Sequence, residues 1–161
     1  MPYTIRAVRN SSDLEVVRAL LREYAVHLNA SLGAEHICLT EYEKELAGLP
    51  SPYQIMLIAF AIDDHGNEEV AGCVLLKPIE GACEMKRLWV RPQFQGLGIG
   101  RKLAEELIDA ARQHGYSAMY LDTVPAAMKA AYHLYRALGF APVERYNDNP
   151  VPDVVFFRRD L

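Results

Sequence analysis

Residues 95–100 read Gln95-Gly96-Leu97-Gly98-Ile99-Gly100, and this glycine-rich stretch lies between a strand-like run and an amphipathic segment. The run before it, residues 84–90, ends at Arg91-Pro92, and proline is not tolerated inside a central strand. The segment after it has apolar residues at helical spacing, namely Ile99, Leu103, Leu107, Ile108 and Ala111. The stretch therefore predicts a turn that connects a strand to a helix.

The composition of this turn suits the binding of an anion. Three glycines remove Cβ atoms and permit positive φ angles, so the backbone N–H groups of residues 96–101 can point at one ligand. The first turn of the following helix adds unpaired N–H donors and the positive end of the helix dipole. Arg101 adds a full positive charge. We therefore expect a phosphate or pyrophosphate at this position.

Two common phosphate-binding loops fit the spacing poorly. A P-loop needs four residues between its first glycine and Gly-Lys-Ser/Thr, whereas Gly96 and Gly100 enclose only three. A dinucleotide fingerprint matches Gly96-x-Gly98, but its third glycine would fall on Arg101. Its acidic residue would be Asp122, and the surrounding βαβ units are not evident in the sequence. Dinucleotide binding remains the less favoured alternative.

Two motifs carry a resemblance to a known family. Gln95-x-x-Gly98-x-Gly100, directly after Val90-Arg91-Pro92, resembles motif A of the GNAT superfamily of acyl-CoA-dependent N-acetyltransferases. Residues 131–140 are similar to the Ala-x-x-Leu-Tyr-x-x-x-Gly-Phe signature that follows motif A in this family. Two signatures in the right order and spacing are more specific than either one, and the resemblance is strongest from Glu84 to Phe140.

The resemblance implies an α/β (α+β) GNAT-like fold, with a mixed central sheet of about six or seven strands flanked by about four helices. Hydrophobic periodicity and turn residues predict the element order βααβββαβαββ within one domain, residues 1–161. The predicted strands are residues 4–8, 55–62, 69–76, 83–90, 118–123, 141–146 and 154–158. The predicted helices are residues 13–29, capped by Ser12 or Asp13, then 41–47, 98–113 and 126–138.

The length, net charge and cysteines of the chain exclude several classes of protein. A chain of 161 residues suits one core, and a formal net charge of −4 argues against binding nucleic acid by phosphate neutralisation. There is no apolar signal core at the N-terminus and no run of bilayer-spanning length, so we expect a cytoplasmic protein without a membrane partner. Cys38, Cys73 and Cys83 have no metal-ligand spacing and the histidines are scattered, so we predict no metal site.

The resemblance implies acetyl-CoA as cosubstrate. The backbone of Leu88, Trp89 and Val90 would hold the pantetheine arm and polarise the acetyl carbonyl. The pyrophosphate would be bound by Gln95, Gly96, Leu97, Gly98, Ile99, Gly100 and Arg101. One departure from the family pattern is Met128, which stands where an asparagine often helps to hold CoA.

Tyr135 is the candidate general acid, because it is the tyrosine of the downstream signature. Its hydroxyl is neutral at pH 7 and can donate a proton to the departing thiolate. The alternative is a core aromatic, since Tyr135 shares one helical face with apolar residues such as Met128 and Leu138. Tyr132, one turn earlier, is an alternative proton donor. The signature favours Tyr135 as the acid.

Glu84 is the candidate base, acting directly or through water. A carboxylate in a predicted central strand is costly to bury and requires an explanation. One explanation is catalytic, because Glu84 lies a few residues from the expected acyl group on the same strand. The other is a same-face pair with Lys86, and both explanations stay open. A thiol nucleophile at Cys83 is disfavoured, because no histidine lies near it in the sequence.

Other segments are candidates for the acceptor pocket. Asp122 and Thr123 end a strand that would face the acyl site. Residues 146–150 have turn composition, which is their favoured interpretation, although the resemblance also places this loop beside the acceptor. The N-terminal helical region would cover the pocket with Tyr24, His27, Asn29 and Glu35, which helix packing explains equally well.

Together these features predict direct acetyl transfer, in a ternary complex, to a primary amine of a small molecule or peptide. The mild acidity slightly favours a cationic acceptor such as a polyamine. A non-catalytic acyl-CoA sensor on the same fold is the main alternative. The family resemblance also permits a homodimer through the C-terminal strands.

Overall fold

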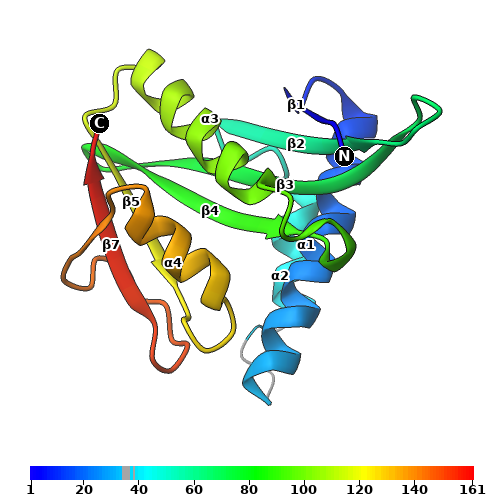
Figure 1. Ribbon diagram of the computed structural model, residues 1–161. Coiled ribbons are helices and arrows are strands. Elements are labelled where there is room, and N and C mark those ends of the chain that lie inside the picture. The colour runs from blue at the N-terminus through cyan, green and yellow to red at the C-terminus, as the bar shows by residue number, and fades with distance from the viewer. Residues whose placement is uncertain (34–36, 38) are drawn as a thin grey trace.

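The computed structural model describes residues 1–33, 37 and 39–161, so Glu35 and Cys38 lie outside the described residues. A seven-stranded mixed sheet with the order β1-β2-β3-β4-β5-β7-β6 forms the centre of the molecule (Figure 1). The strands are β1 (Tyr3–Ala7), β2 (Ile55–Ile62), β3 (Glu68–Ile79), β4 (Ala82–Val90), β5 (Ala118–Thr123), β6 (Ala141–Pro142) and β7 (Val155–Asp160). The helices are α1 (Ser11–Leu32), α2 (Leu39–Ala47), α3 (Ile99–Gln113) and α4 (Lys129–Ala137), with a 3₁₀ turn η1 at Pro92–Phe94. The predicted fold class is confirmed.

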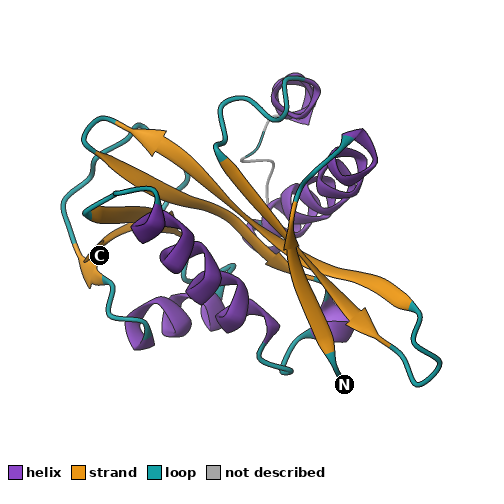
Figure 2. Ribbon diagram, turned by 90° about the horizontal axis from the view of Figure 1, so that it is seen from above, coloured by secondary structure: helices purple, strands orange, loops and turns teal. Residues whose placement is uncertain are grey.

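Helices cover both faces of the sheet, α1 and α2 on one side and α3 and α4 on the other (Figure 2). Strand β2 shows why its sequence is apolar throughout. Leu57 and Ala59 belong to the core on the α3 side, whereas Ile58 and Phe60 belong to the core on the α1 side. Successive side chains of a strand point to opposite faces, so a strand covered on both faces has no polar alternation.

Several predicted boundaries were wrong. Helix α1 is capped by Asn10, whose side chain accepts a hydrogen bond of 2.9 Å from the Asp13 backbone N–H, and not by Ser12 or Asp13. Helix α4 begins at Lys129, because residues 124–128 form a turn in which the Met128 N–H donates to the Val124 carbonyl at 2.9 Å.

The predicted strand 141–146 is another boundary error, since β6 contains only Ala141 and Pro142. Beyond β6 the chain leaves the sheet and forms a loop in which Asn147 and Asn149 each accept a hydrogen bond from a backbone N–H two residues ahead. Such Asx turns compete with strand pairing, which explains the early end of the strand.

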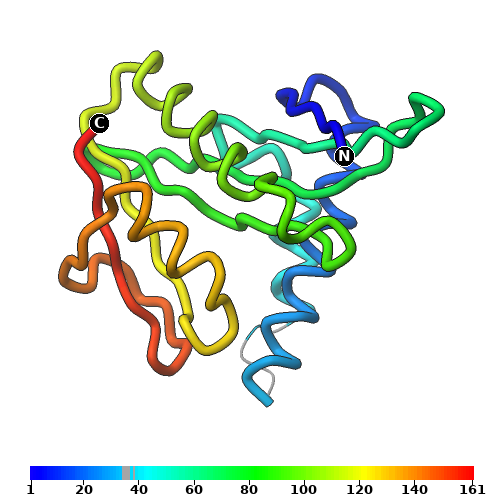
Figure 3. The backbone as a smooth tube through the Cα atoms, in the orientation of Figure 1, coloured from blue at the N-terminus to red at the C-terminus, as the bar shows by residue number. Residues whose placement is uncertain are grey.

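Strands β4 and β5 separate in the middle of the sheet, as the backbone trace shows (Figure 3). Their parallel pairing is limited to Cys83 with Met119 and Glu84 with Tyr120. Beyond this point the register of β4 against β3 shifts, and Arg87 has a positive φ of 58°. A bulge of this kind bends its strand, so the carboxyl ends of β4 and β5 diverge and leave an opening between them.

The pairing pattern also bears on the dinucleotide alternative. Of the strand pairings in the described residues, only that of β4 with β5 is parallel. The repeated βαβ units of a dinucleotide-binding sheet are therefore not found in this part of the chain. Among the described helices, none is long and apolar enough to cross a membrane.

Candidate active site

The glycine-rich turn lies at the open end of β4 and leads into α3. Gly96 and Gly98 have φ angles of 82° and 83°, which side chains with a Cβ rarely adopt, and Gly98 is the N-cap of α3. The Gln95 side-chain amide donates to the Val90 carbonyl at 3.0 Å and so ties the turn to the end of β4. The sequence of the turn thus determines its backbone, and the first N–H groups of α3 have no partner within the helix.

A groove of about 380 Å³ runs between this turn, the end of β4 and the start of α4. All the residues predicted to bind the cosubstrate line it except Leu97, which is exposed; the lining members are Leu88, Trp89, Val90, Gln95, Gly96, Gly98, Ile99, Gly100 and Arg101. The Arg101 guanidinium forms an exposed ion pair of 2.9 Å with Glu105, so its charge remains at the mouth of the groove. The groove therefore combines backbone donors, a helix N-terminus and a cation.

A second cavity, of about 320 Å³, lies in the opening between β4 and β5. Helix α1, both strands, α4 and residues 147–151 contribute to its lining. The cavity and the groove share Leu88, Met128 and Ala131, so the two spaces adjoin at the bend of β4. Both candidate catalytic residues, Glu84 and Tyr135, line the cavity.

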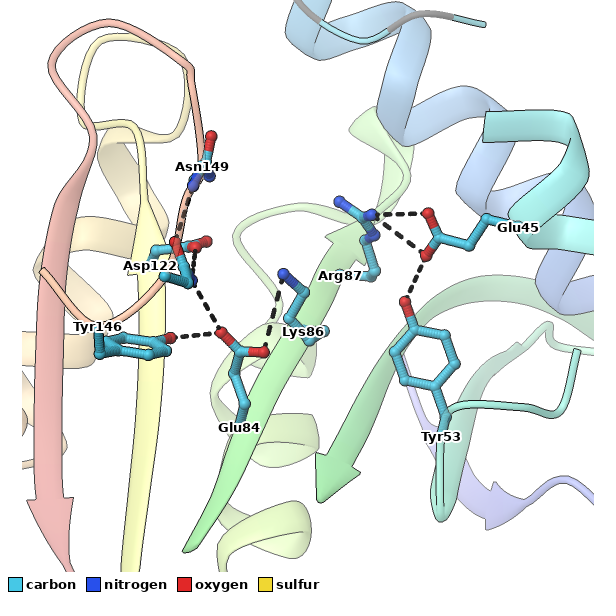
Figure 4. A network of polar contacts seen from close by, with 9 residues as sticks. Glu45, Tyr53, Glu84, Lys86, Arg87, Asp122, Tyr146 and Asn149 are labelled. Atoms are coloured by element: carbon cyan, nitrogen blue, oxygen red, sulfur yellow. Dashed lines mark hydrogen bonds and ion pairs between the residues drawn. The ribbon is translucent and has the colours of Figure 1, made fainter. Parts of the chain in front are cut away.

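Glu84 is almost fully buried, with 3% of its surface exposed, and it is held by side chains from two directions (Figure 4). The Tyr146 hydroxyl and the Asn147 amide both donate to its Oε2 atom, the latter at 3.3 Å. Lys86 Nζ lies 3.9 Å from Oε1. The carboxylate thus borders the cavity and also pairs with Lys86, so the geometry is compatible with both sequence interpretations.

The sequence composition of the loop after β6 predicted only a turn, but side chains of this loop also form part of the cavity wall. The Asn147 amide nitrogen also lies 2.7 Å from Asp122 Oδ2, so it connects two carboxylates on neighbouring strands. Burial, and then the hydrogen bond to Glu84, raise the pKa of Tyr146 well above its ordinary value. Sequence reasoning noted this loop but missed these contacts, because 62 or more residues separate both partners from Glu84.

Tyr135 is buried, with 6% of its surface exposed, and its ring lies 6.0 Å from that of Phe140. It is therefore a core aromatic and a lining residue of the cavity at once. Burial raises the pKa of its hydroxyl above the ordinary value of 10, so the group is protonated at neutral pH. Tyr132 packs on Phe157, with ring centroids 5.7 Å apart, and lines neither the groove nor the cavity.

Comparison with known proteins identifies this arrangement. The family model described as the Acetyltransferase (GNAT) family matches residues 15–140. The chain belongs to the GNAT family. An uncharacterized N-acetyltransferase of Schizosaccharomyces pombe is 36% identical over 160 residues, which cover 98% of this chain and 94% of that protein. Such relatives and the shared fold make this GNAT protein an acyltransferase.

Solved structures of GNAT proteins share the whole fold. An acetyltransferase from Streptococcus agalactiae superposes with a TM-score of 0.76 at 22% identity, covering 99% of this chain and 98% of the other. The PaiA N-acetyltransferase from Thermoplasma acidophilum, solved in complex with coenzyme A, gives a TM-score of 0.73 at 20% identity with both chains fully covered. At these identities the likeness concerns the fold.

A half-buried arginine of this GNAT protein was not among the residues predicted from the sequence. Arg87 lines the cavity, and its Nη2 atom lies 3.3 Å from both carboxylate oxygens of Glu45 on α2. Tyr53 donates to Glu45 at 2.6 Å, and the guanidinium lies over the rings of Tyr24 and Tyr42. The sequence did contain a signal for Arg87, namely a charged residue in a predicted central strand. The same kind of signal led to the choice of Glu84.

The thiol of Cys83 is not a nucleophile at neutral pH. Burial raises its pKa to about 11, and its Sγ atom lies 3.5 Å from the Ala118 carbonyl. The thiolate is the reactive form, and it is scarce under these conditions. Cys83 therefore has a packing role beside the Glu84 site.

Proposed function

We propose that this GNAT enzyme transfers an acetyl group from acetyl-CoA to the primary amine of a small molecule or peptide, in a ternary complex without an acetyl-enzyme. The junction of groove and cavity at Leu88, Met128 and Ala131 carries the proposal. A donor in the groove and an acceptor in the cavity would meet at this junction. Direct transfer needs such proximity of the two reactants.

The groove fits the pyrophosphate of coenzyme A. Its backbone donors come from a turn with two glycines at positive φ, and a Cβ at either glycine would project into open space where a ligand can approach. Gly100 would accept a Cβ at 3.6 Å from Val90, so packing within the protein does not require a glycine there. The coenzyme A complex of the T. acidophilum relative supports this choice of ligand.

Glu84 is the proposed base. A primary ammonium with a pKa near 10 must lose a proton before its nitrogen can attack a thioester. The proton would go to Glu84, whose Oε1 atom accepts no hydrogen bond from the described residues, and from there to solvent. The hydrogen bonds from Tyr146 and Asn147 would keep the carboxylate oriented.

Tyr135 is the proposed acid. As the new C–N bond forms and the C–S bond breaks, the sulfur of coenzyme A needs a proton, which the Tyr135 hydroxyl would supply. The second proton of the amine nitrogen then restores the phenol. In the overall reaction, one ammonium and one acetyl-CoA are converted to one amide, one free coenzyme A and one proton.

Thermal denaturation with acetyl-CoA, coenzyme A and NAD at equal concentrations tests the donor assignment. A ligand at about 100 times its Kd stabilises a protein by about 2.7 kcal/mol, which is a shift of several degrees for a chain of this size. We expect both coenzyme A species to raise the midpoint and NAD to leave it unchanged. A shift with NAD alone would refute the proposal.

Thiol release with a panel of amines then tests turnover. Coenzyme A appearing in proportion to acetylated amine supports the transferase, and a burst of thiol without amine would indicate an acetyl-enzyme. Tight coenzyme A binding without thiol release for any amine would instead support an acyl-CoA sensor.

A further inference from the structure

We propose that the acceptor of this enzyme is a small amino acid or related amino-carboxylate. Its ammonium would lie against Glu84 and Asp122, and its carboxylate would be bound by Lys86 and Arg87. This inference rests on the proposed acetyl transfer and names the acceptor class. The amino-carboxylate takes the place of the cationic acceptor, such as a polyamine, that the net charge of the chain slightly favoured. The charges that line the cavity are closer to the ligand than the rest of the protein surface and therefore decide which ligand binds.

The cavity is lined by charges of both signs. Two carboxylates, Glu84 and Asp122, and three cationic side chains, Lys77, Lys86 and Arg87, contribute to its wall. A polyamine would bring further positive charge against three cations and would be repelled. A monoamine without a carboxylate would leave the cations of the cavity unpaired on binding. A zwitterion can pair with the carboxylates through its ammonium and with the cations through its carboxylate.

The cationic groups are incompletely paired by the protein. Lys86 has only 19% of its side chain exposed, and its 3.9 Å distance to Glu84 is too long for a hydrogen bond. Within the described residues Lys86 Nζ makes no hydrogen bond, although an ammonium has three donors. Arg87 Nε is buried and likewise has no partner among these residues. Shielded donors of this kind favour an anionic ligand.

The carboxylates are incompletely paired as well. Asn147 donates to one oxygen of each, at 3.3 Å to Glu84 and 2.7 Å to Asp122. The remaining oxygens, Glu84 Oε1 and Asp122 Oδ1, accept no hydrogen bond from the described residues. An ammonium can donate to both, which would hold the amine next to the proposed base.

A cation and a carboxylate, Arg87 and Asp122, lie on opposite sides of the opening (Figure 4). Arg87 reaches toward Glu45 and Tyr53, whereas Asp122, Tyr146 and Asn149 lie on the opposite side, with Lys86 and Glu84 between them. Arg87 keeps a positive φ of 58°, a strained backbone conformation for a side chain of this size, and its bulge fixes the guanidinium beside the cavity. At about 320 Å³ the cavity suits a small ligand.

Matched acceptors test the proposal. Thiol release is measured with the twenty amino acids, with their amides, which keep the ammonium and side chain but lose the carboxylate charge, and with spermidine. We expect kcat/KM for at least one amino acid to exceed that of its amide by at least tenfold. Equal or better use of the amides or of spermidine, or no turnover of any amino acid, would overturn the proposal.

A variant identifies the group that binds the carboxylate. Lys86→Met keeps an apolar stem and removes the charge, so we expect KM for the best amino acid to rise about 10- to 100-fold, the range for one charged hydrogen bond. kcat/KM for its amide should fall much less, because the amide has no carboxylate for Lys86 to bind. Lys44→Met, at an exposed position of α2, is the control and should change neither value. Equal losses for acid and amide in Lys86→Met would overturn the assignment.

Binding of acetyl-CoA distinguishes a failure of the amino-carboxylate acceptor from a failure of the proposed acetyl transfer. If acetyl-CoA gives no thermal shift, the acetyl transfer itself is wrong. If acetyl-CoA binds and only amines without a carboxylate are acetylated, the transferase stands and the amino-carboxylate acceptor is refuted.

Discussion

Replacing Glu84 by glutamine separates its catalytic role from its structural one. The change keeps the shape of the side chain and its oxygen acceptor, so Tyr146 and Asn147 can still donate to it. It removes the negative charge and with it the capacity to take a proton at neutral pH. Lys86 loses an ion-pair partner 3.9 Å away, a contact too long to be a major source of stability.

The expected loss of kcat in Glu84→Gln follows from the fraction of the acceptor amine that is unprotonated. An alkylammonium with a pKa near 10.4 has about one molecule in a thousand in the neutral form at pH 7.4. Without a base the enzyme depends on this fraction, so we expect kcat to fall by about 10²- to 10⁴-fold, the usual contribution of general-base catalysis. The remaining activity of Glu84→Gln should rise about tenfold per pH unit up to the pKa of the amine.

The assay is thiol release between pH 7 and 9.5, with acetyl-CoA affinity measured in parallel. Asp122→Asn is the matched control, because it removes a carboxylate from the same cavity and keeps an acceptor for Asn147. It should raise KM for the amine and leave the wild-type pH slope of kcat unchanged. Wild-type kcat in Glu84→Gln, or a loss that stays constant with pH, would refute the role of Glu84 as base.

Three further predictions concern the proposed acid, the glycine-rich turn and the half-buried ion pair of Arg87 with Glu45. Tyr135→Phe should lower kcat at least about tenfold with unchanged acetyl-CoA affinity, whereas Tyr132→Phe, outside the cavity, should stay near wild type; equal effects would reject the assignment. Gly98→Val and Gly66→Val both place a side chain at a φ above 80° and should each destabilise the fold by about 1–2 kcal/mol in chemical denaturation. Only the first should abolish coenzyme A binding by calorimetry, and retained binding there would contradict the turn as the pyrophosphate site. Burial raises the pKa of Glu45, but its arginine partner and tyrosine hydrogen bond outweigh this and lower it on balance. Its contribution to stability is therefore present above pH 4.5 and lost as the pH falls further, so Glu45→Gln should be less stable at pH 7 and show a weaker acid dependence of the melting temperature.

Local patterns in the sequence determined the elements with a strong period and the turn between two of them. Helix α3 lies within one residue of its predicted range, because its apolar stripe and the glycine before it are both local signals. Strand β2 was predicted with its observed bounds, since an uninterrupted apolar run leaves no other choice. The cap of α1 was misplaced, because several neighbouring polar residues can cap the same backbone donors. The start of α4 was misplaced, because a turn closed by the Met128 N–H and the Val124 carbonyl precedes the helix.

Motifs alone predicted nine lining residues of the groove, because these nine lie between positions 88 and 101. The second cavity is different. Its charges come from β3, β4 and β5, the loop after β6 adds amide side chains, and one bulge in β4 at Arg87 sets how these groups face one another. Side-chain pairing across more than 60 residues has no local signature. The sequence by itself therefore determined the fold class and the glycine-rich turn, because both depend on short-range periodicity and backbone freedom. Only the tertiary structure decided which charges share the cavity, because the opening between two strands is a property of the whole sheet.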